Sequence, residues 1–257
     1  MNHFNTANQI LMTNQFTISE VCICEAAKVW KNDGEILATG IGLLPRIAVG
    51  LAKKFHNPDL MMTDGEAFLI DQPHPLGVGA EPSVDGYMTY SRVFDVLWSG
   101  ARHAMVTPTQ IDKYAHLNIS SIGNYAQPKV QLLGVRGFPG NSISHRNSIF
   151  IPNHSKKVFV EGSVDMISSV GFDADGVEPL IGKVITNLGI FDYQGKKNTL
   201  RLLSIHSTSS LDEIRDNTGF EFEIFSTDET TNPTKDELDI IRTELDPNNL
   251  RSSVIGE

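Results

Sequence analysis

Two pairs of residues that could take part in chemistry each follow a short apolar run of the chain. Gly40 and Gly42 follow the first run, and Asp64 and Glu66 follow the second. Glycine lets backbone N–H groups approach a ligand closely, and a carboxylate can act as a general base or as a nucleophile. The pattern therefore indicates a ligand turn that faces two carboxylates. The alternative is that both segments are only turns, because short Gly-x-Gly signals are weak.

A second segment combines glycines with an arginine. Gly137 and Gly140 follow an apolar pair, and Arg136 and Asn141 lie beside them. A short helix that begins near Pro139 or Asn141 would expose N–H groups that can hold an anion. Arg136 would add a bidentate donor for a carboxylate or a phosphate. The alternative is a surface arginine on a turn.

Single histidines and the two cysteines are weaker signals. His145 and His154 are candidates for a substrate contact, but a single histidine is more often a surface residue or a satisfied core residue. Cys22 and Cys24 are the only cysteines, and they lie two positions apart in a predicted helix. Their side chains would therefore point about 200° apart around the helix axis. We expect reduced core thiols and no metal site.

The first segment is embedded in a predicted strand, helix and second strand. Pro45 suits the first turn of a helix, and Ile47, Leu51 and Phe55 would share its buried face. Residues 60–62 form a short unbroken apolar run, which is typical of a strand covered on both faces. These elements predict a right-handed βαβ unit.

The βαβ unit predicts where a ligand would bind. In an open α/β sheet, ligands bind beyond the carboxyl ends of the strands. Gly40, Gly42 and Asp64 would all lie at that edge.

A long loop is predicted next. Residues 71–86 contain three prolines and three glycines, too many for a helix or a central strand. Long loops in compact domains are often functional, and this loop begins shortly after Glu66. It is therefore placed to act as a lid or as a partner surface.

The remaining elements complete a predicted α/β fold. Residues 91–100 have helical periodicity, with Val93, Val96 and Leu97 facing inward and Phe94 and Trp98 at the adjoining positions. Two β-rich runs within residues 184–205 predict a hairpin. We expect an open, mostly parallel sheet with flanking helices and an antiparallel addition.

Length and composition indicate one globular domain. A chain of 257 residues buries roughly three quarters of the surface that its unfolded form exposes. We expect a flexible tail at residues 1–16, one domain at 17–246, and a C-terminal tail at 247–257 that frays or docks on a partner.

Charge and hydropathy exclude several kinds of partner. A net charge of -10 argues against a nucleic-acid-binding surface. The chain has neither an apolar run of membrane-spanning length nor a signal-peptide pattern at its start. We expect a cytoplasmic protein without nucleic-acid or membrane partners.

Several of these pieces, in chain order, resemble the beta subunit of the family I CoA-transferases, such as that of glutaconate CoA-transferase. The resemblance covers most of residues 19–245. It is carried by the Gly40 and Gly42 turn with its Pro45 helix and by residues 60–66, 110–114 with Asn118, 160–161, 165–168, 171–172 and 187–192.

This resemblance implies a fold similar to that of the sugar-phosphate isomerases and a paired alpha subunit. In the transferases a glutamate of a Glu-Asn-Gly or similar turn attacks the acyl-CoA and forms a glutamyl thioester. The corresponding turn here is residues 63–66, with Asp64 at the nucleophile position. Aspartate is one methylene shorter, and a displacement of about 1 Å can cost on the order of 100-fold in rate.

A second departure points to a subgroup of the family. Residues 136–140 replace the Gly-Gly-Ala type loop of the transferases with a bulkier, charged sequence. Both departures are similar to the beta subunit of the steroid (cholesterol) ring-cleaving hydrolases. The closer match is carried by residues 64–67, 135–137 and 139–141 and by His145.

The closer resemblance implies hydration and retro-Claisen cleavage of a cyclic CoA ester without an acyl-enzyme. The main glutamate base is then expected in the alpha subunit, while Asp64 and Glu66 orient water or partner groups. Arg136 and the loop from Gly137 to Asn141 would shape the site and hold the developing enolate.

The implied assembly is an α2β2 heteromer that binds a CoA thioester. Coenzyme A is expected as part of the substrate, with no bound cofactor. Two alternatives stay open. The chain could belong to a true CoA-transferase in which Asp64 or Glu66 takes the acyl group, or it could be a catalytically silent scaffold for its alpha partner.

Overall fold

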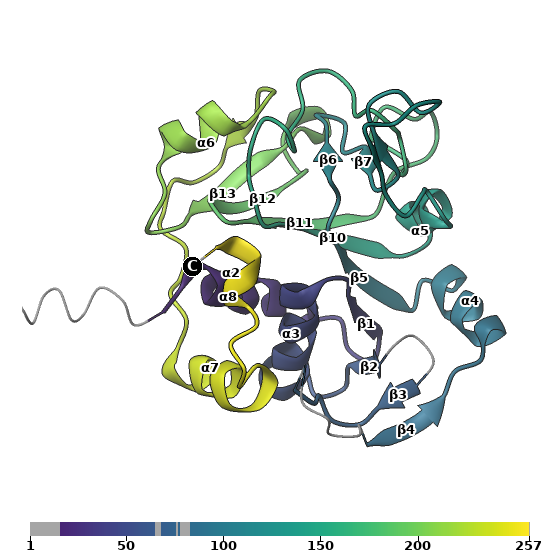
Figure 1. Ribbon diagram of the computed structural model, residues 1–257, viewed down its shortest axis with the longest axis vertical. Coiled ribbons are helices and arrows are strands. Elements are labelled where there is room, and N and C mark those ends of the chain that lie inside the picture. The colour runs from purple at the N-terminus through teal and green to yellow at the C-terminus, as the bar shows by residue number, and fades with distance from the viewer. Residues whose placement is uncertain (1–15, 65–67, 76, 78–82, 257) are drawn as a thin grey trace, which may run out of the picture.

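The protein folds around a ten-stranded sheet with helices on both faces (Figure 1). The computed structural model describes residues 16–64, 68–75, 77 and 83–256. The strand order is β14-β13-β12-β11-β10-β5-β1-β2-β3-β4. The central strands run parallel: β11 (Ile181–Thr186), β10 (Arg146–Ile151), β5 (Arg102–Val106), β1 (Leu37–Gly40) and β2 (Met61–Asp64). The predicted open, mostly parallel α/β sheet is therefore confirmed.

Antiparallel strands flank the parallel centre on both sides. On one side β12 (Gly189–Asp192) and β13 (Arg201–Ile205) form the predicted hairpin, followed by β14 (Glu223–Ile224). On the other side lie β3 (Phe68–Ile70) and β4 (Val84–Tyr87). Short pairs outside the main sheet are β6 (Gln110–Ile111) with β7 (Leu117–Asn118), and β8 (Ser121–Ile122) with β9 (Val130–Gln131).

The prediction of a loop throughout residues 71–86 is wrong at its end. Val84, Asp85 and Gly86 belong to β4, which pairs only with β3 and forms the edge of the sheet. An edge strand tolerates glycine and charge because one side of it needs no ladder partner. The glycine and proline content of the segment hid this strand.

Successive residues of the strands feed two hydrophobic cores, one on each face of the sheet. Met105, Phe150 and Ile185 pack with α2 and α3 on what we call the α3 face. Their neighbours Ala104 and Ile149 belong to the core of the opposite face, which we call the α5 face because α5 contributes Phe138 to it.

The helices have these bounds. They are α2 (Ile18–Ala27), α3 (Leu43–Leu51), α4 (Tyr90–Trp98), α5 (Phe138–Ser144), α6 (Leu211–Asn217), α7 (Lys235–Ile240) and α8 (Ser252–Ile255). Short 3₁₀ turns cover Lys28–Trp30 and Lys196–Asn198, and π-helical turns cover Ala52–His56 and Ile241–Leu245.

The π-helical turn after α3 changes which side chains face the core. Ile47 and Leu51 are buried as predicted, but Phe55 is 43% exposed. The wider turn at Ala52–His56 alters the angular spacing of the side chains, so a face extrapolated at α-helical spacing no longer points inward.

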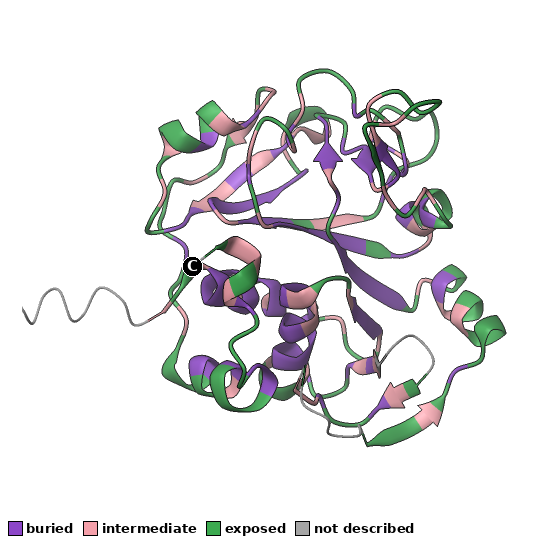
Figure 2. Cartoon of the chain, viewed as in Figure 1, coloured by how far each residue is buried: buried purple, intermediate pink, exposed green. Residues whose placement is uncertain are grey.

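Helix α4 leaves its aromatic side chains in solvent (Figure 2). Leu97 is buried and Val93 and Val96 are partly buried, in agreement with the predicted inward face. Phe94 lies between Tyr90 and Trp98, with ring centroids 6.3 and 6.1 Å apart, in an exposed aromatic row.

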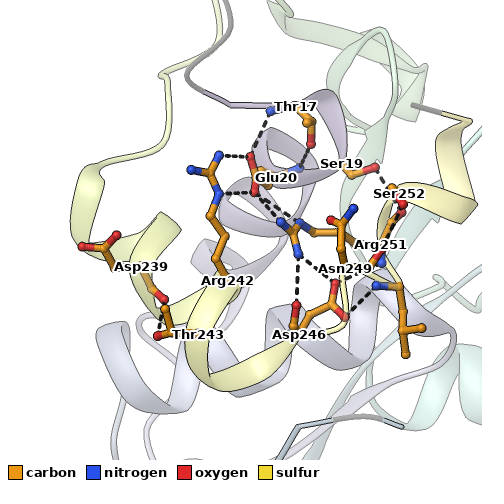
Figure 3. Close-up of polar contacts among 11 residues, drawn as sticks. Thr17, Ser19, Glu20, Asp239, Arg242, Thr243, Asp246, Asn249, Arg251 and Ser252 are labelled. Atoms are coloured by element: carbon orange, nitrogen blue, oxygen red, sulfur yellow. Dashed lines mark hydrogen bonds and ion pairs between the residues drawn. The ribbon is translucent and has the colours of Figure 1, made fainter.

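The chain after Asp246 packs on α2 and does not fray (Figure 3). The fully buried carboxylate of Glu20 accepts hydrogen bonds from Arg242 Nε at 2.7 Å and from Arg251 Nη2 at 2.9 Å. Arg251 Nη1 also pairs with Asp246 Oδ2 at 3.0 Å. These guanidinium groups hold the pKa of Glu20 below its usual value even though burial opposes this.

The correction to the C-terminal tail has a simple cause. The dipeptide Asp246-Pro247 has the sequence of a helix stop, but Asp246 accepts the N–H groups of Leu250 and Arg251. Buried charges need such partners, so the segment is fixed by contacts that lie far away in the sequence. The predicted N-terminal tail lies almost entirely outside the described residues.

Candidate functional site

A pocket of about 280 Å³ opens at the carboxyl ends of β1 and β2, on the side of α3. We call it the α3 pocket. Its walls combine small, apolar and hydroxyl side chains with one arginine. The lining residues are Ala38, Thr39, Gly40, Ile41, Gly42, Arg46, Val49, Met62 and Thr63. The structure thus places both glycines of the first predicted segment at the strand edge where ligands of open α/β sheets bind.

The turn between β1 and α3 requires its two glycines for different reasons. A side chain at Gly40 would collide with the backbone carbonyl of Pro45. Gly42 has a φ of 116°, in the region that favours glycine. Ile41 N–H donates to Met105 O at 2.9 Å, which ties the turn to β5. The pocket wall is therefore a fixed part of the sheet.

Sequence reasoning missed Arg46, which lines the α3 pocket from the helix. Arg46 lies four residues after Gly42, and its N–H donates to Gly42 O at 3.0 Å. Its Nη1 lies 3.7 Å from Met62 Sδ, and its Nη2 is buried. The available signal was a basic residue one turn into a helix that starts from a Gly-x-Gly turn.

The backbone of Asp64 continues directly from the pocket wall. Asp64 is the last residue of β2, follows the pocket residue Thr63 and pairs with Phe68 of β3. The structure therefore brings the end of β2 beside Gly40 and Gly42. The predicted carboxylate Glu66 lies outside the described residues, as does the side chain of Asp64.

The second predicted segment forms a helix start on the α5 face. Helix α5 begins at Phe138, next to the predicted position. Arg136 is exposed and has a left-handed φ of 52°. A side chain added at Gly137 or Gly140 would meet no atom within 4 Å. The residues from Arg136 to Asn141 do not line the α3 pocket, so the structure separates the two predicted segments within this chain.

His145 is a buried residue at the end of α5. It is 1% exposed, and burial lowers its pKa to about 4, so the ring is neutral at pH 7. Its Nδ1 lies 3.1 Å from Arg146 O, and its Nε2 has no hydrogen-bond partner among the described residues. Like Arg136, it is absent from the described lining of the α3 pocket.

His154 is a satisfied core histidine, the alternative that its isolated position left open. Its ring nitrogens lie 3.2 Å from Thr186 Oγ1 and 2.9 Å from Thr218 Oγ1. It stacks on Phe159, and burial lowers its pKa to about 3.

One arrangement that sequence reasoning missed has the geometry of a catalytic triad without its access. His103 Nε2 lies 2.9 Å from Ser148 Oγ, and His103 Nδ1 lies 2.6 Å from Asp33 Oδ2. Ser148 is completely buried, and even a methyl group at Gly182 would collide with its hydroxyl. A nucleophile must reach its substrate, so these groups link the Asp33 loop to β5 and β10.

A second hollow of about 520 Å³ lies near the C-terminal end of α3. Its lysines already hold the fold together. Lys54 Nζ pairs with Glu244 Oε2 at 2.8 Å, and Lys53 Nζ donates to Leu60 O at 2.6 Å. The α3 pocket is therefore the better candidate for a ligand site.

Metal and membrane sites are absent from the described part of the chain. No group of three histidine, cysteine, aspartate or glutamate side chains among residues 16–64, 68–75, 77 and 83–256 is placed to hold a metal ion. Within the same ranges, no helix has the length and apolar character needed to cross a membrane.

Relatives of known identity match nearly the whole chain. The cholesterol ring-cleaving hydrolase IpdB subunit of Rhodococcus jostii (strain RHA1) is 39% identical over 250 residues, which cover 94% of this chain and 97% of the relative. The beta subunit of glutaconate CoA-transferase from Acidaminococcus fermentans is 28% identical, and the match covers 90% of this chain and 93% of the relative. No protein-family model matches the chain.

Solved structures share the fold. The crystal structure of Rhodococcus jostii RHA1 IpdAB matches with a TM-score of 0.86 at 38% identity, covering 94% of this chain and 99% of the matched chain. The decarboxylase AibA/AibB matches with a TM-score of 0.80 at 21% identity, covering 94% and 99%. The first of these matches confirms the resemblance inferred from the sequence, and the second supports the fold alone.

Proposed function

Because this chain belongs to the family of IpdB subunits of cholesterol ring-cleaving hydrolases, we propose that it is the beta subunit of a heteromeric ring-opening hydrolase. The proposed substrate is a steroid-derived cyclic CoA ester. The observation that carries the proposal is the 39% identity to the ring-cleaving hydrolase subunit over 94% of the chain. Identity to the CoA-transferase subunit is lower, at 28%.

The proposed reaction is a hydrolytic retro-Claisen cleavage. Water attacks a ring carbonyl carbon, and the bond from this carbon to its α-carbon breaks. The bonding electron pair passes to the α-carbon as an enolate, which takes up a proton, while the attacked carbonyl becomes a carboxylate. The reaction needs a base for the water and positive or N–H donors for the enolate oxygen.

The roles of this chain follow from the residues that flank the two predicted segments. The main base is a glutamate of the alpha subunit, and Asp64 and Glu66 orient the water or partner groups. Gly40 and Gly42 form the wall of the α3 pocket. The exposed loop from Arg136 through Gly137, Gly140 and Asn141 would meet substrate from the other side of the sheet edge. His145 supports that loop from the core.

The proposed assembly contains an alpha subunit, in an α2β2 arrangement. The IpdAB and AibA/AibB relatives are two-subunit proteins. Coenzyme A enters as part of the substrate, and we propose no resident cofactor. The proposed location is the cytoplasm, because Cys22 and Cys24 are buried and form no disulfide.

A CoA-transferase is the second candidate, favoured by the carboxylate at the end of β2 beside the α3 pocket. In that case Asp64 or Glu66 would form a thioester with CoA during turnover. Hydroxylamine treatment of the α–β complex after incubation with acyl-CoA distinguishes the two. The hydrolase proposal predicts an unmodified chain with full activity, whereas a hydroxamate on this chain would support the transferase.

The scaffold alternative has its own test. If the chain only stabilises its partner, the isolated alpha subunit should turn over substrate at the full rate once it is folded. The hydrolase proposal predicts that the alpha subunit alone is inactive and that adding this chain restores turnover.

A further inference from the structure

We infer that Arg46 anchors a carboxylate carried by the acyl part of the ligand in the α3 pocket. This inference deepens the proposed function and relies on it for the presence of a CoA thioester. It names a contact residue and a substrate class: acyl groups with a free carboxylate.

The walls of the α3 pocket suit an aliphatic acid. Ala38, Ile41, Val49 and Met62 supply apolar surface. Among the described residues that line the pocket, Arg46 alone carries a charge. A pocket with apolar walls and few convergent polar groups fits an acyl chain that ends in a charged group.

The position of Arg46 makes it a defined donor. Its backbone is fixed by the hydrogen bond to Gly42 O at 3.0 Å, and its guanidinium reaches across to Met62 of β2. Because the Nη2 atom is buried, the fork is held within the protein and does not sweep through solvent. A planar guanidinium presents two parallel N–H groups to the two oxygens of a carboxylate.

The surrounding field strengthens this preference. Arg46 lies in the first turns of α3, a helix of nine residues whose N-terminal end carries partial positive charge. The chain as a whole has a net charge of -10, which repels anions elsewhere. An anionic group would therefore be oriented toward this pocket.

The size of the pocket limits what it holds. A volume of about 280 Å³ lies below the usual range for drug-sized ligands, roughly 300–1,000 Å³. It therefore suits the acyl end of a CoA ester and leaves the nucleotide outside.

The test compares two CoA thioesters of equal acyl length on the α–β complex. Glutaryl-CoA ends in a carboxylate, and valeryl-CoA ends in a methyl group. Isothermal titration calorimetry should show glutaryl-CoA binding about 10-fold or more tightly to the unaltered complex, as expected for a charge-assisted bidentate pair. The preference should be constant from pH 6 to pH 8, because arginine does not titrate there.

Variants assign the preference to Arg46. Arg46→Gln should bind both thioesters with similar affinity, and Arg46→Lys should keep part of the preference. Arg215→Gln removes an equal charge from α6, where Arg215 pairs with Asp212, and should keep the full preference. Circular dichroism and co-purification with the alpha subunit establish that each variant is folded.

Each outcome decides the matter. Equal binding of the two thioesters to the unaltered complex, absence of binding by either, or a preference that survives Arg46→Gln would overturn the inference. If the preference depends on Arg46 but no cyclic CoA ester is opened, the proposed function fails while the assignment of Arg46 stands.

Discussion

The Nη1 atom of Arg46 lies 3.7 Å from the Sδ atom of Met62, so α3 and β2 meet through an arginine inside the α3 pocket. Two residues after Met62, β2 ends at Asp64. This contact joins the two halves of the predicted βαβ unit at the edge where its ligand would bind.

Gly40→Ala should destabilise the protein strongly. The new Cβ would collide with the Pro45 carbonyl, which cannot move without disturbing the start of α3. Overpacking typically costs about 1–3 kcal/mol, and a backbone clash costs at least that much. Chemical denaturation of the variant measures the loss.

Gly140→Ala is the matched control. Gly140 lies inside α5 with open space around it, so alanine should stabilise the helix by about 0.5–1 kcal/mol. If Gly140 contacts substrate, this variant should be folded but slower. Equal stability losses for the two variants would contradict the described packing.

Arg136→Ala should lower turnover without lowering stability. The side chain is exposed, so the free energy of unfolding should change by less than about 0.5 kcal/mol. Turnover by the α–β complex should fall strongly if Arg136 holds the enolate. Unchanged kinetics would remove Arg136 from the proposed site.

Glu20→Ala should cost about 3–5 kcal/mol of stability, because it leaves the buried Arg251 guanidinium with an incomplete set of partners. Urea denaturation measures the loss, and limited proteolysis should show release of the C-terminal segment. Asp239→Ala breaks only the exposed pair with Lys235 and should cost less than about 1 kcal/mol. A loss at Glu20 as small as at Asp239 would show that the cluster does not fasten the segment.

The protein should lose stability as the pH falls from about 6.5 toward 4. Burial lowers the pKa of His154 to about 3 and the pKa of His145 and His206 to about 4. The unfolded chain takes up these protons near pH 6.5 and the folded chain does not, so acid favours unfolding. Each histidine contributes up to about 1.4 kcal/mol per pH unit in this window.

Urea titrations at several pH values would check this slope, and His154→Gln should reduce it by about one histidine's share. The pKa of His116 is raised, mainly by its hydrogen bond to Asp112, so its contribution is fully present below pH 6.5 and is lost only as the pH rises. It does not offset the acid effect. A stability that is flat between pH 6.5 and pH 4.5 would contradict the burial of these rings.

Local patterns were sufficient for the elements whose causes are local. The turn at Gly40 and Gly42, helix α3 and the buried strand β2 each carry their own signal, and the Thr17 and Glu20 capping box begins α2 as its spacing indicates. The hairpin of β12 and β13 follows for the same reason.

The missed features depend on distant contacts. The exposure of Phe55 follows from a π-helical turn that periodicity does not encode. Arg251 is buried because Glu20, 231 positions away, accepts its guanidinium. Arg46 resembles a solvated helix residue in the sequence, and only the packing of α3 on β2 shows that it lines a pocket.

The most direct test of the account is ring opening in water enriched in ¹⁸O, followed by mass spectrometry of the product and of this chain. The α–β complex should convert a cyclic β-diketone-like CoA ester into a ring-opened CoA ester that carries one ¹⁸O in its new carboxylate, with the chain unmodified. An intact ring, with CoA transferred to an added carboxylic acid and a thioester on Asp64 or Glu66, would contradict it.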